Sequence, residues 1–340
     1  MNSRRNFAGR RLTPLRRVMR RTVGMGCLCV VAAAAVPHLR AHAQAVGAQA
    51  TAPAQPRLLR AGDVDTLPVR EPGVRIAYGR DSLQFGDLRM PAGRGPFPVA
   101  IILHGGCWFS PYASVRNTAP LAQALADAGV ATWNVEYRRY DQVGGGWPGT
   151  FRDAADAADY VRALATRFPL DTSRIVAAGH SAGGHLALWL ASRHTLPVTS
   201  ALAGGRPLAL QGVVSIGGIA DLREFFVREK RTCGNPAVES LLGGVPDSVS
   251  QRVRDGSPIE RLPLRVPSIH IAGERDFIAP LAMREAYAAA ARAKGDSVVV
   301  LTIPDDGHFE AIAPMRETGR AVIAAVLRLL ASTARNDPRP

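Results

Sequence analysis

The segment GHSAG at residues 179–183 constrains the fold of this chain more than any other part of its sequence. It joins an apolar run at residues 174–178 to a helical pattern. A serine exposed at a sharp strand-to-helix turn needs small neighbours two residues away on each side, and the glycines at both ends of the segment meet that need. We therefore predict that Ser181 is a nucleophile at such a turn, with the amide of Ala182 directed at a developing oxyanion.

Strand and helix patterns alternate on both sides of this turn. Strands are predicted at residues 74–78, 83–90, 98–103, 130–137, 174–178, 211–216, 266–272 and 298–303, and helices at 119–128, 151–167, 184–192, 283–293 and 320–330. This alternation predicts the α/β class, with a mostly parallel central sheet flanked by helices. Residues 220–263 interrupt the pattern, and we expect them to form a small cap insertion.

The first 43 residues have the features of an export signal. They contain nine arginines, no acidic residue and an uncharged apolar run at residues 23–36, which is short for a membrane span. Residues 41–43 (AHA) offer a small-x-small cleavage site, and residues 3–7 resemble a twin-arginine motif. We predict a signal peptide over residues 1–43, periplasmic or secreted localisation, and no stable membrane anchor after cleavage. An uncleaved anchor is the alternative.

The positive charge of the chain is concentrated in this N-terminal stretch. The formal net charge is +14, and removing the nine arginines leaves +5. Because no basic stripe remains to follow a phosphate backbone, we predict no nucleic-acid partner. Residues 44–73 are rich in Ala, Gln, Pro and Arg without an apolar period, and are predicted to be a flexible linker. Residues 74–335 then form the predicted catalytic domain.

A second glycine-rich loop, HGGCW at residues 104–108, follows the third predicted strand. An oxyanion hole needs a further backbone N–H from a loop that can approach the substrate closely. We predict that Gly105, Gly106 and Cys107 form this loop. Its amides would act together with that of Ala182.

An acid and a base follow the serine in the order expected of a Ser-Asp-His triad. Asp276 comes just after the strand at 266–272, and His308 comes just after the strand at 298–303. Open α/β sheets hold their sites at the carboxyl ends of strands. We predict that His308 takes the proton of Ser181 and that Asp276 orients and stabilises the His308 ring.

Other histidines and acids are expected to have structural roles. The alternatives for the base are His104, His180, His185 and His270, and those for the acid are Glu274, Asp305 and Asp306. We expect His104 to brace the glycine-rich loop, His180 to point away from the site and His185 to be a packing residue. No cluster of side chains has metal-ligand spacing and no dinucleotide-binding motif is present, so neither a metal nor a cofactor is predicted.

Aromatic residues near the glycine-rich loop are predicted to contact the substrate. They are Trp108, Phe109, Tyr112 and Trp147. Phe225 and Phe226 of the insertion are expected either to contact the substrate or to be core residues, and the sequence favours neither alternative.

Two cysteines, Cys107 and Cys233, lie outside the predicted signal peptide. In an oxidising compartment they could form a disulfide, which would tether the insertion to the glycine-rich loop. Two separate, partly buried thiols are the alternative, and the sequence favours neither.

The motifs HGGCW, GHSAGGH, GERDFIAP and DDGHFE, in this order, resemble those of the α/β-hydrolase superfamily. More narrowly, the chain is similar over residues 74–330 to the branch that includes kynurenine formamidase (arylformamidase) and related carboxylesterases. The resemblance implies an α/β-hydrolase fold, with Ser181, Asp276 and His308 as nucleophile, acid and base.

We therefore predict a serine hydrolase that cleaves a small-molecule ester or aryl formamide through an acyl-enzyme on Ser181. A serine peptidase of the prolyl-oligopeptidase type is one alternative, but residues 44–73 are too few for the large N-terminal domain such peptidases usually carry. A non-catalytic binding protein with a hydrolase fold is the other alternative.

Overall fold

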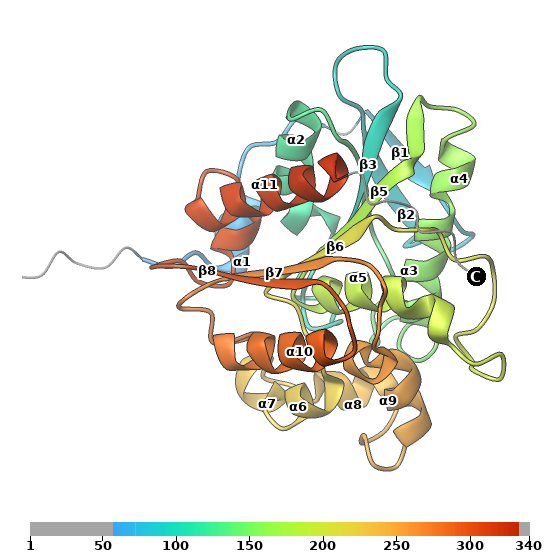
Figure 1. Cartoon of the computed structure of the whole chain (residues 1–340), viewed down its shortest axis with the longest axis vertical. Coiled ribbons are helices and arrows are strands. Elements are labelled where there is room, and N and C mark those ends of the chain that lie inside the picture. Colours follow the sequence, from blue (N-terminus) through green and yellow to red (C-terminus); the bar gives the residue numbers. More distant parts are fainter. Residues whose placement is uncertain (1–56, 72, 333–340) are drawn as a thin grey trace, which may run out of the picture. The chain divides into compact units, whose positions relative to one another are not determined.

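An eight-stranded sheet organises the computed structural model, which describes residues 57–71 and 73–332. The strand order is β1-β2-β4-β3-β5-β6-β7-β8 (Figure 1). The strands are β1 (Val74–Ala77), β2 (Phe85–Arg89), β3 (Phe97–Leu103), β4 (Ala131–Val135), β5 (Leu170–His180), β6 (Gly212–Ile216), β7 (Ser268–Gly273) and β8 (Val298–Ile303). β2 runs antiparallel to both of its neighbours, and all other neighbouring strands are parallel. The predicted α/β class with a mostly parallel sheet is therefore confirmed.

Helices cover both faces of this sheet (Figure 1). One face carries α1 (Ala61–Asp65), α2 (Val115–Asp127) and α11 (Glu317–Ala331); the other carries α3 (Gly149–Asp159), α4 (Val161–Leu164), α5 (Ala182–Ser192) and α10 (Leu281–Ala293). The single helix predicted over 151–167 is divided at Tyr160 into α3 and α4. Short 3₁₀ turns lie at η1 (Arg193–Thr195), η2 (Pro258–Arg261) and η3 (Glu310–Ile312).

The central strand β3 is buried on both faces, as its uninterrupted apolar sequence predicts. Val99, Ile101 and Leu103 belong to the core under α3 and α5, whereas Ala100 and Ile102 belong to the core under α2 and α11. This division follows from the two-residue period of a strand.

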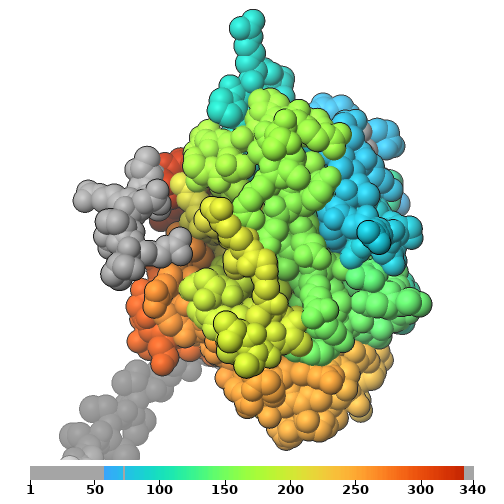
Figure 2. Space-filling view, turned by 90° about the vertical axis from the view of Figure 1, so that its right-hand side faces the viewer, coloured from blue at the N-terminus to red at the C-terminus, as the bar shows by residue number. Residues whose placement is uncertain are grey.

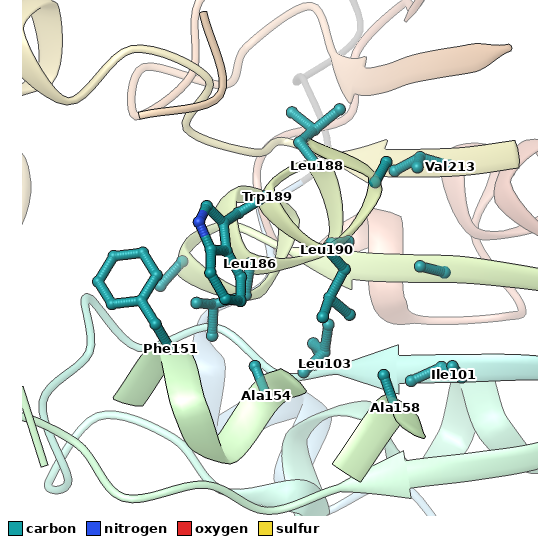
Figure 3. Close-up of a cluster of buried hydrophobic side chains, with 14 of the residues drawn as sticks. Ile101, Leu103, Phe151, Ala154, Ala158, Leu186, Leu188, Trp189, Leu190 and Val213 are labelled. Carbon is teal, nitrogen blue, oxygen red and sulfur yellow. The ribbon is translucent and has the colours of Figure 1, made fainter. Parts of the chain in front are cut away.

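The core between the sheet, α3 and α5 combines an aromatic pair with aliphatic side chains and the small alanines of α3 (Figure 3). Phe151 meets Trp189 edge to face, with ring centroids 5.1 Å apart. The Trp189 indole N–H donates to the carbonyl oxygen of Asp255 at 3.0 Å, so this core also holds the following insertion in place. Ala154 and Ala158 of α3 let that helix approach the sheet closely.

The segment between β6 and β7 is the helical insertion that interrupts the sequence pattern. It contains α6 (Leu222–Phe226), α7 (Glu229–Thr232), α8 (Ala237–Leu242) and α9 (Ser250–Gly256). His185 Nε2 donates to the carbonyl oxygen of Gly256 at 2.8 Å, which adds a second hydrogen bond between α5 and the insertion. In Figure 2 its orange-coloured part forms a block at the lower edge of the molecule.

The residues just before β1 pack on the domain, contrary to the linker prediction. Within the described part of residues 44–73, α1 buries Val64 completely, and the Leu59 N–H donates to Glu310 Oε1. The predicted absence of packed structure is therefore wrong for this part. Within residues 57–71, Val64 is the one fully buried side chain, and Leu59 and Leu67 pack on the same core only in part. No regular apolar period therefore marks this segment in the sequence. The signal peptide predicted over residues 1–43 lies outside the described residues, as do residues 44–56.

None of the helices in residues 57–71 and 73–332 is long and apolar enough to cross a membrane.

Three fully buried histidines make stability depend on pH. Burial lowers the pKa of His180 to about 3, of His185 to about 4 and of His270 to about 3. In the unfolded chain each has a pKa near 6.5, so below this pH the unfolded state binds protons that the native state excludes. The free energy of unfolding should therefore fall on acidification from pH 6.5 to about pH 4, by up to about 1.4 kcal/mol per pH unit for each histidine.

Urea unfolding between pH 7.5 and pH 4.5 measures this slope. His270→Gln removes one group that takes up a proton on unfolding. The slope of unfolding free energy against pH should therefore fall by up to about 1.4 kcal/mol per pH unit. His194→Gln is the matched control, because His194 is exposed, and should leave the slope unchanged. Stability that stays constant from pH 7 to pH 5 would contradict the prediction.

Candidate active site

Ser181 occupies a sharp turn between β5 and α5. Its backbone has φ 54° and ψ −118°, and its N–H donates to the carbonyl oxygen of Ile216 at 2.8 Å. A Cβ atom on Gly179 would lie 2.1 Å from the Gly183 oxygen, and a Cβ on Gly183 would lie 2.1 Å from the Leu103 oxygen. Both distances are far below van der Waals contact, so this turn requires glycine at both positions.

Asp276 and His308 meet at the carboxyl ends of β7 and β8. The Asp276 Oδ2 atom accepts from His308 Nδ1 at 2.7 Å, and Oδ1 accepts from the N–H groups of Ile278 and Ala279 at 2.9 Å each. Burial by itself raises the pKa of the Asp276 carboxyl, but His308 and the two amides outweigh burial and hold the pKa below its usual range. The carboxylate therefore stays charged and fixes the proton of His308 on Nδ1, which leaves Nε2 as an acceptor.

Ser181 and His308 line the same pocket, which has a volume of about 540 Å³. Its walls include Gly106 and Cys107 of the glycine-rich loop, Tyr112 shortly after that loop, and residues 231–234 of the insertion. Ile278 and Phe309, beside the acid and the base, also line the pocket. Loops that are far apart in the sequence thus form one cavity around the serine. Within residues 57–71 and 73–332, no group of three or more His, Cys, Asp or Glu side chains could hold a metal ion.

The glycine-rich loop lies directly against the serine. A Cβ on Gly105 would be 3.0 Å from the Ser181 Cβ atom, and the next two residues, Gly106 and Cys107, have positive φ angles of 97° and 51°. Among the described residues, the N–H groups of Gly106, Cys107 and Ala182 donate no hydrogen bond. The geometry can therefore supply backbone donors from two sides to an oxygen atom near Ser181.

A buried polar network supports this loop from behind. His104 Nδ1 lies 2.9 Å from the Gly105 oxygen and its Nε2 lies 2.9 Å from Glu136 Oε1, while the Tyr137 hydroxyl donates to the His104 oxygen at 2.7 Å. Arg139 Nη1 also donates to Glu136 Oε1, at 2.6 Å. Burial raises the pKa of Glu136, but His104, Arg139 and a backbone amide outweigh it and lower the pKa below its usual range. The expectation that His104 braces the loop is confirmed.

A disulfide joins Cys107 of the glycine-rich loop to Cys233 of the insertion, across 126 residues of sequence. The Tyr112 hydroxyl also donates to the Cys233 oxygen, at 2.8 Å. Of the two alternatives for these cysteines, a disulfide or two separate thiols, the structure contains the disulfide. Because both sulfur-bearing residues line the pocket, the bond fixes the turn after α7 relative to the loop beside Ser181.

Most of the predicted substrate-contacting aromatics lie outside the pocket. Trp108 has no exposed surface and packs edge-on against His185, with centroids 5.1 Å apart, so its predicted contact with substrate is wrong. Phe109 stacks on Tyr140 and Trp147 packs on Phe151. Of the four predicted residues only Tyr112 lines the pocket. Nearness along the chain to the glycine-rich loop did not determine the direction of these side chains.

His180 lies beside the base, although it was expected to point away. Its ring centroid is 4.4 Å from that of His308, and its Nε2 donates to the His308 carbonyl oxygen at 3.1 Å. The two-residue period of β5 does place His180 opposite its neighbours. However, the loop that carries His308 packs on that side, which the strand pattern alone cannot show.

Several pocket residues were not identified from the sequence. They are Ala61, Ala113, Asn117, Arg231, Thr232, Gly234, Ile278 and Phe309. Ile278 and Phe309 lie within the motifs GERDFIAP and DDGHFE but were not singled out there, and the other six belong to no motif. All eight come together only through the fold.

This combination of a serine at a strand-to-helix turn, a paired acid and histidine after later strands, and a mostly parallel sheet defines an α/β-hydrolase. A family model described as BD-FAE matches residues 87–289, and the chain belongs to that family.

One relative of the chain and two solved structures with a similar fold are named as esterases. It is 28% identical over 260 residues to "Esterase LipC" of Mycobacterium tuberculosis, which covers 75% of this chain and 64% of LipC. The match thus spans just under two thirds of that relative. Among solved structures, esterase B from Lactobacillus rhamnosis has a TM-score of 0.67 at 19% identity, covering 79% of this chain and 89% of that chain. A propionate-bound esterase from Thermogutta terrifontis has a TM-score of 0.60 at 20% identity, covering 78% and 96%. These two structures show the fold.

Loss of the disulfide should weaken both the fold and the site. We expect Cys107→Ser with Cys233→Ser to lower the free energy of unfolding by about 2–5 kcal/mol, because the bond closes a long loop. The specificity constant should fall as well, since the glycine-rich loop loses its tether. Urea unfolding and steady-state kinetics of protein beginning at residue 44 measure both effects.

Thiol titration of the denatured, unreduced wild-type protein provides the direct check. It should find no reactive thiol from Cys107 or Cys233. Two reactive thiols would show that the bond does not form.

Proposed function

We propose that this protein is a serine hydrolase that cleaves carboxylic esters through an acyl-enzyme on Ser181. The observation that carries the proposal is the 2.7 Å contact between Asp276 and His308 Nδ1, in a pocket where His308 and Ser181 both contribute to the wall. Membership of the BD-FAE family and the similarity to a relative named as an esterase support the same activity.

The first half-reaction forms the acyl-enzyme. Ser181 Oγ attacks the ester carbonyl carbon while His308 Nε2 takes the hydroxyl proton. The carbonyl oxygen becomes an oxyanion that accepts from the Ala182 amide and from the loop amides of Gly106 or Cys107. Asp276 remains ionised and stabilises the imidazolium. The C–O bond of the ester then breaks, and His308 gives its proton to the departing alcohol.

The second half-reaction releases the acid. A water molecule replaces the alcohol, His308 takes one of its protons, and the resulting hydroxide attacks the acyl carbon. Collapse of the second oxyanion breaks the bond between the acyl carbon and Ser181 Oγ. His308 then gives its proton to Oγ, and the carboxylic acid leaves. An aryl formamide can follow the same steps with an arylamine as leaving group, so formamides belong among the substrates to be tested.

We also propose that the protein is exported. The signal-like sequence of residues 1–43 and the Cys107–Cys233 disulfide support this localisation independently, because disulfides persist mainly in oxidising compartments. In cell fractionation, the exported form should begin at Gln44 by mass spectrometry. Recovery of only the uncleaved, reduced chain in the cytosol would contradict the proposal.

Replacing the nucleophile tests the proposed activity. Ser181→Ala should lower kcat for p-nitrophenyl acetate and p-nitrophenyl butyrate by about 10⁴–10⁶-fold, because the acyl-enzyme can no longer form. Ser173→Ala, an exposed serine at the far end of β5, is the control and should retain full activity. Equal rates for Ser181→Ala and wild type would exclude Ser181 as the nucleophile.

The same assay with N-formylkynurenine separates the two substrate classes. We expect the esters to have the larger kcat/KM. A clearly larger value for the formamide would instead make this enzyme an arylformamidase.

A further inference from the structure

We infer that the pocket selects esters that carry a carboxylate, and that Arg231 is the residue that recognises this group. The inference rests on the proposed ester hydrolysis and names the substrate class of the same site. The insertion supplies Arg231 at the end of α7, within the pocket wall formed by residues 231–234.

The described wall of the pocket carries a cationic side chain and no carboxylate. Among the described residues that line it, Arg231 is the one lysine or arginine, and no aspartate or glutamate is present. The remaining lining side chains are neutral, apart from the two histidines, His180 and His308. Asp276, behind His308, already accepts three hydrogen bonds and so does not offer a counter-ion to Arg231.

Arg231 has no partner within the part of the chain that the structure describes. Its guanidinium makes neither an ion pair nor a hydrogen bond there, and the residue is exposed. The acids nearest in sequence are engaged elsewhere: Glu224 pairs with Arg228 at 3.8 Å, and Glu229 accepts from the Val238 N–H at 2.5 Å. An unpaired arginine is ordinary on a surface, but here it borders the cavity that holds the reactive serine.

The backbone that carries Arg231 is held in place. The Cys233 N–H donates to the Glu229 oxygen at 2.6 Å, and the Cys233 carbonyl accepts from Tyr112 at 2.8 Å. The disulfide to Cys107 ties the same turn to the glycine-rich loop. The backbone of Arg231 is therefore fixed, and only its flexible side chain has to adjust to a ligand.

A carboxylate is the group that this arrangement fits best. The planar guanidinium can donate two parallel hydrogen bonds to it, while Ile278, Phe309 and Tyr112 contact the apolar part of an ester. Because Arg231 is exposed, water and salt weaken the pair. The expected preference lies between that of a surface ion pair and that of a charge-assisted hydrogen bond, at about 5- to 50-fold.

Matched pairs of substrates isolate the charge. For the alcohol side we would compare 4-acetoxybenzoate with 4-acetoxybenzamide, and for the acyl side the mono-4-nitrophenyl ester of glutaric acid with the corresponding glutaramate. The measured quantity is the ratio of kcat/KM for the anionic and the neutral member. Wild type should favour the anionic member of at least one pair, mainly through KM, and 0.5 M NaCl should reduce that ratio.

Variants of the disulfide-bonded protein then test Arg231 itself. Arg231→Gln should lower the anionic-to-neutral ratio by about 5- to 50-fold and remove its dependence on salt, whereas Arg231→Lys should keep part of both. Arg94→Gln is the control, because Arg94 is exposed and lies outside the pocket wall. A ratio that is the same in Arg231→Gln and wild type at low salt would overturn the inference.

Failure of this inference can be told apart from failure of the proposed function. If Ser181→Ala abolishes hydrolysis but Arg231→Gln leaves the ratio unchanged, the protein is an esterase and only the selection of anions is wrong. If Ser181→Ala hydrolyses the substrates like wild type, the proposed function fails. Calorimetric binding of 4-acetoxybenzoate and 4-acetoxybenzamide to Ser181→Ala gives the same comparison of affinities without turnover, and equal affinities would overturn the inference.

Discussion

The contact between the Ser181 turn and the end of β3 is the constraint on which the rest of the site depends. A Cβ atom on Gly183 would lie 2.1 Å from the Leu103 oxygen and 2.4 Å from the His104 oxygen, so the two backbones touch only because this side chain is absent. That approach places the loop after β3 beside the serine, where Gly105 packs on Ser181. One backbone contact thus positions both the nucleophile and the amides that face it. The left-handed φ of Ser181 is maintained by the hydrogen bond to β6 and by the helix that follows.

The features predicted correctly from the sequence are those that the local chain determines. All eight predicted strands are present, although β5 begins at Leu170 rather than at residue 174. The two glycine-rich loops fall at strand ends because backbone contact dictates the residue type there. The direction of Trp108 and the placement of His180 depend on neighbours from distant segments, and both were predicted wrongly. The sequence could not decide between a disulfide and two separate thiols for the same reason. The two cysteines are 126 residues apart, and composition does not indicate whether they lie close together in space.

The insertion is anchored to the domain rather than attached only at its two ends. Its last helix accepts hydrogen bonds from His185 and Trp189 of α5, and Phe225 packs against Trp108 in the main core. The disulfide adds a covalent tie at the pocket itself. Opening this segment as a lid would break all of these contacts together, so the described structure favours a fixed wall and a preformed pocket over a moving cover.

Chemistry and selectivity are assigned to different parts of this pocket. The amides beside Ser181 belong to buried backbone that is already oriented, so their effect on a developing charge needs no rearrangement when the reaction occurs. Arg231 acts from an exposed side chain whose field is screened by water, and it contributes through ground-state binding. Interactions made equally in the ground and transition states change KM, whereas those strengthened in the transition state change kcat. Residues of the insertion turn can therefore vary to suit different substrates while the turn at Ser181 and the Asp276–His308 pair stay the same.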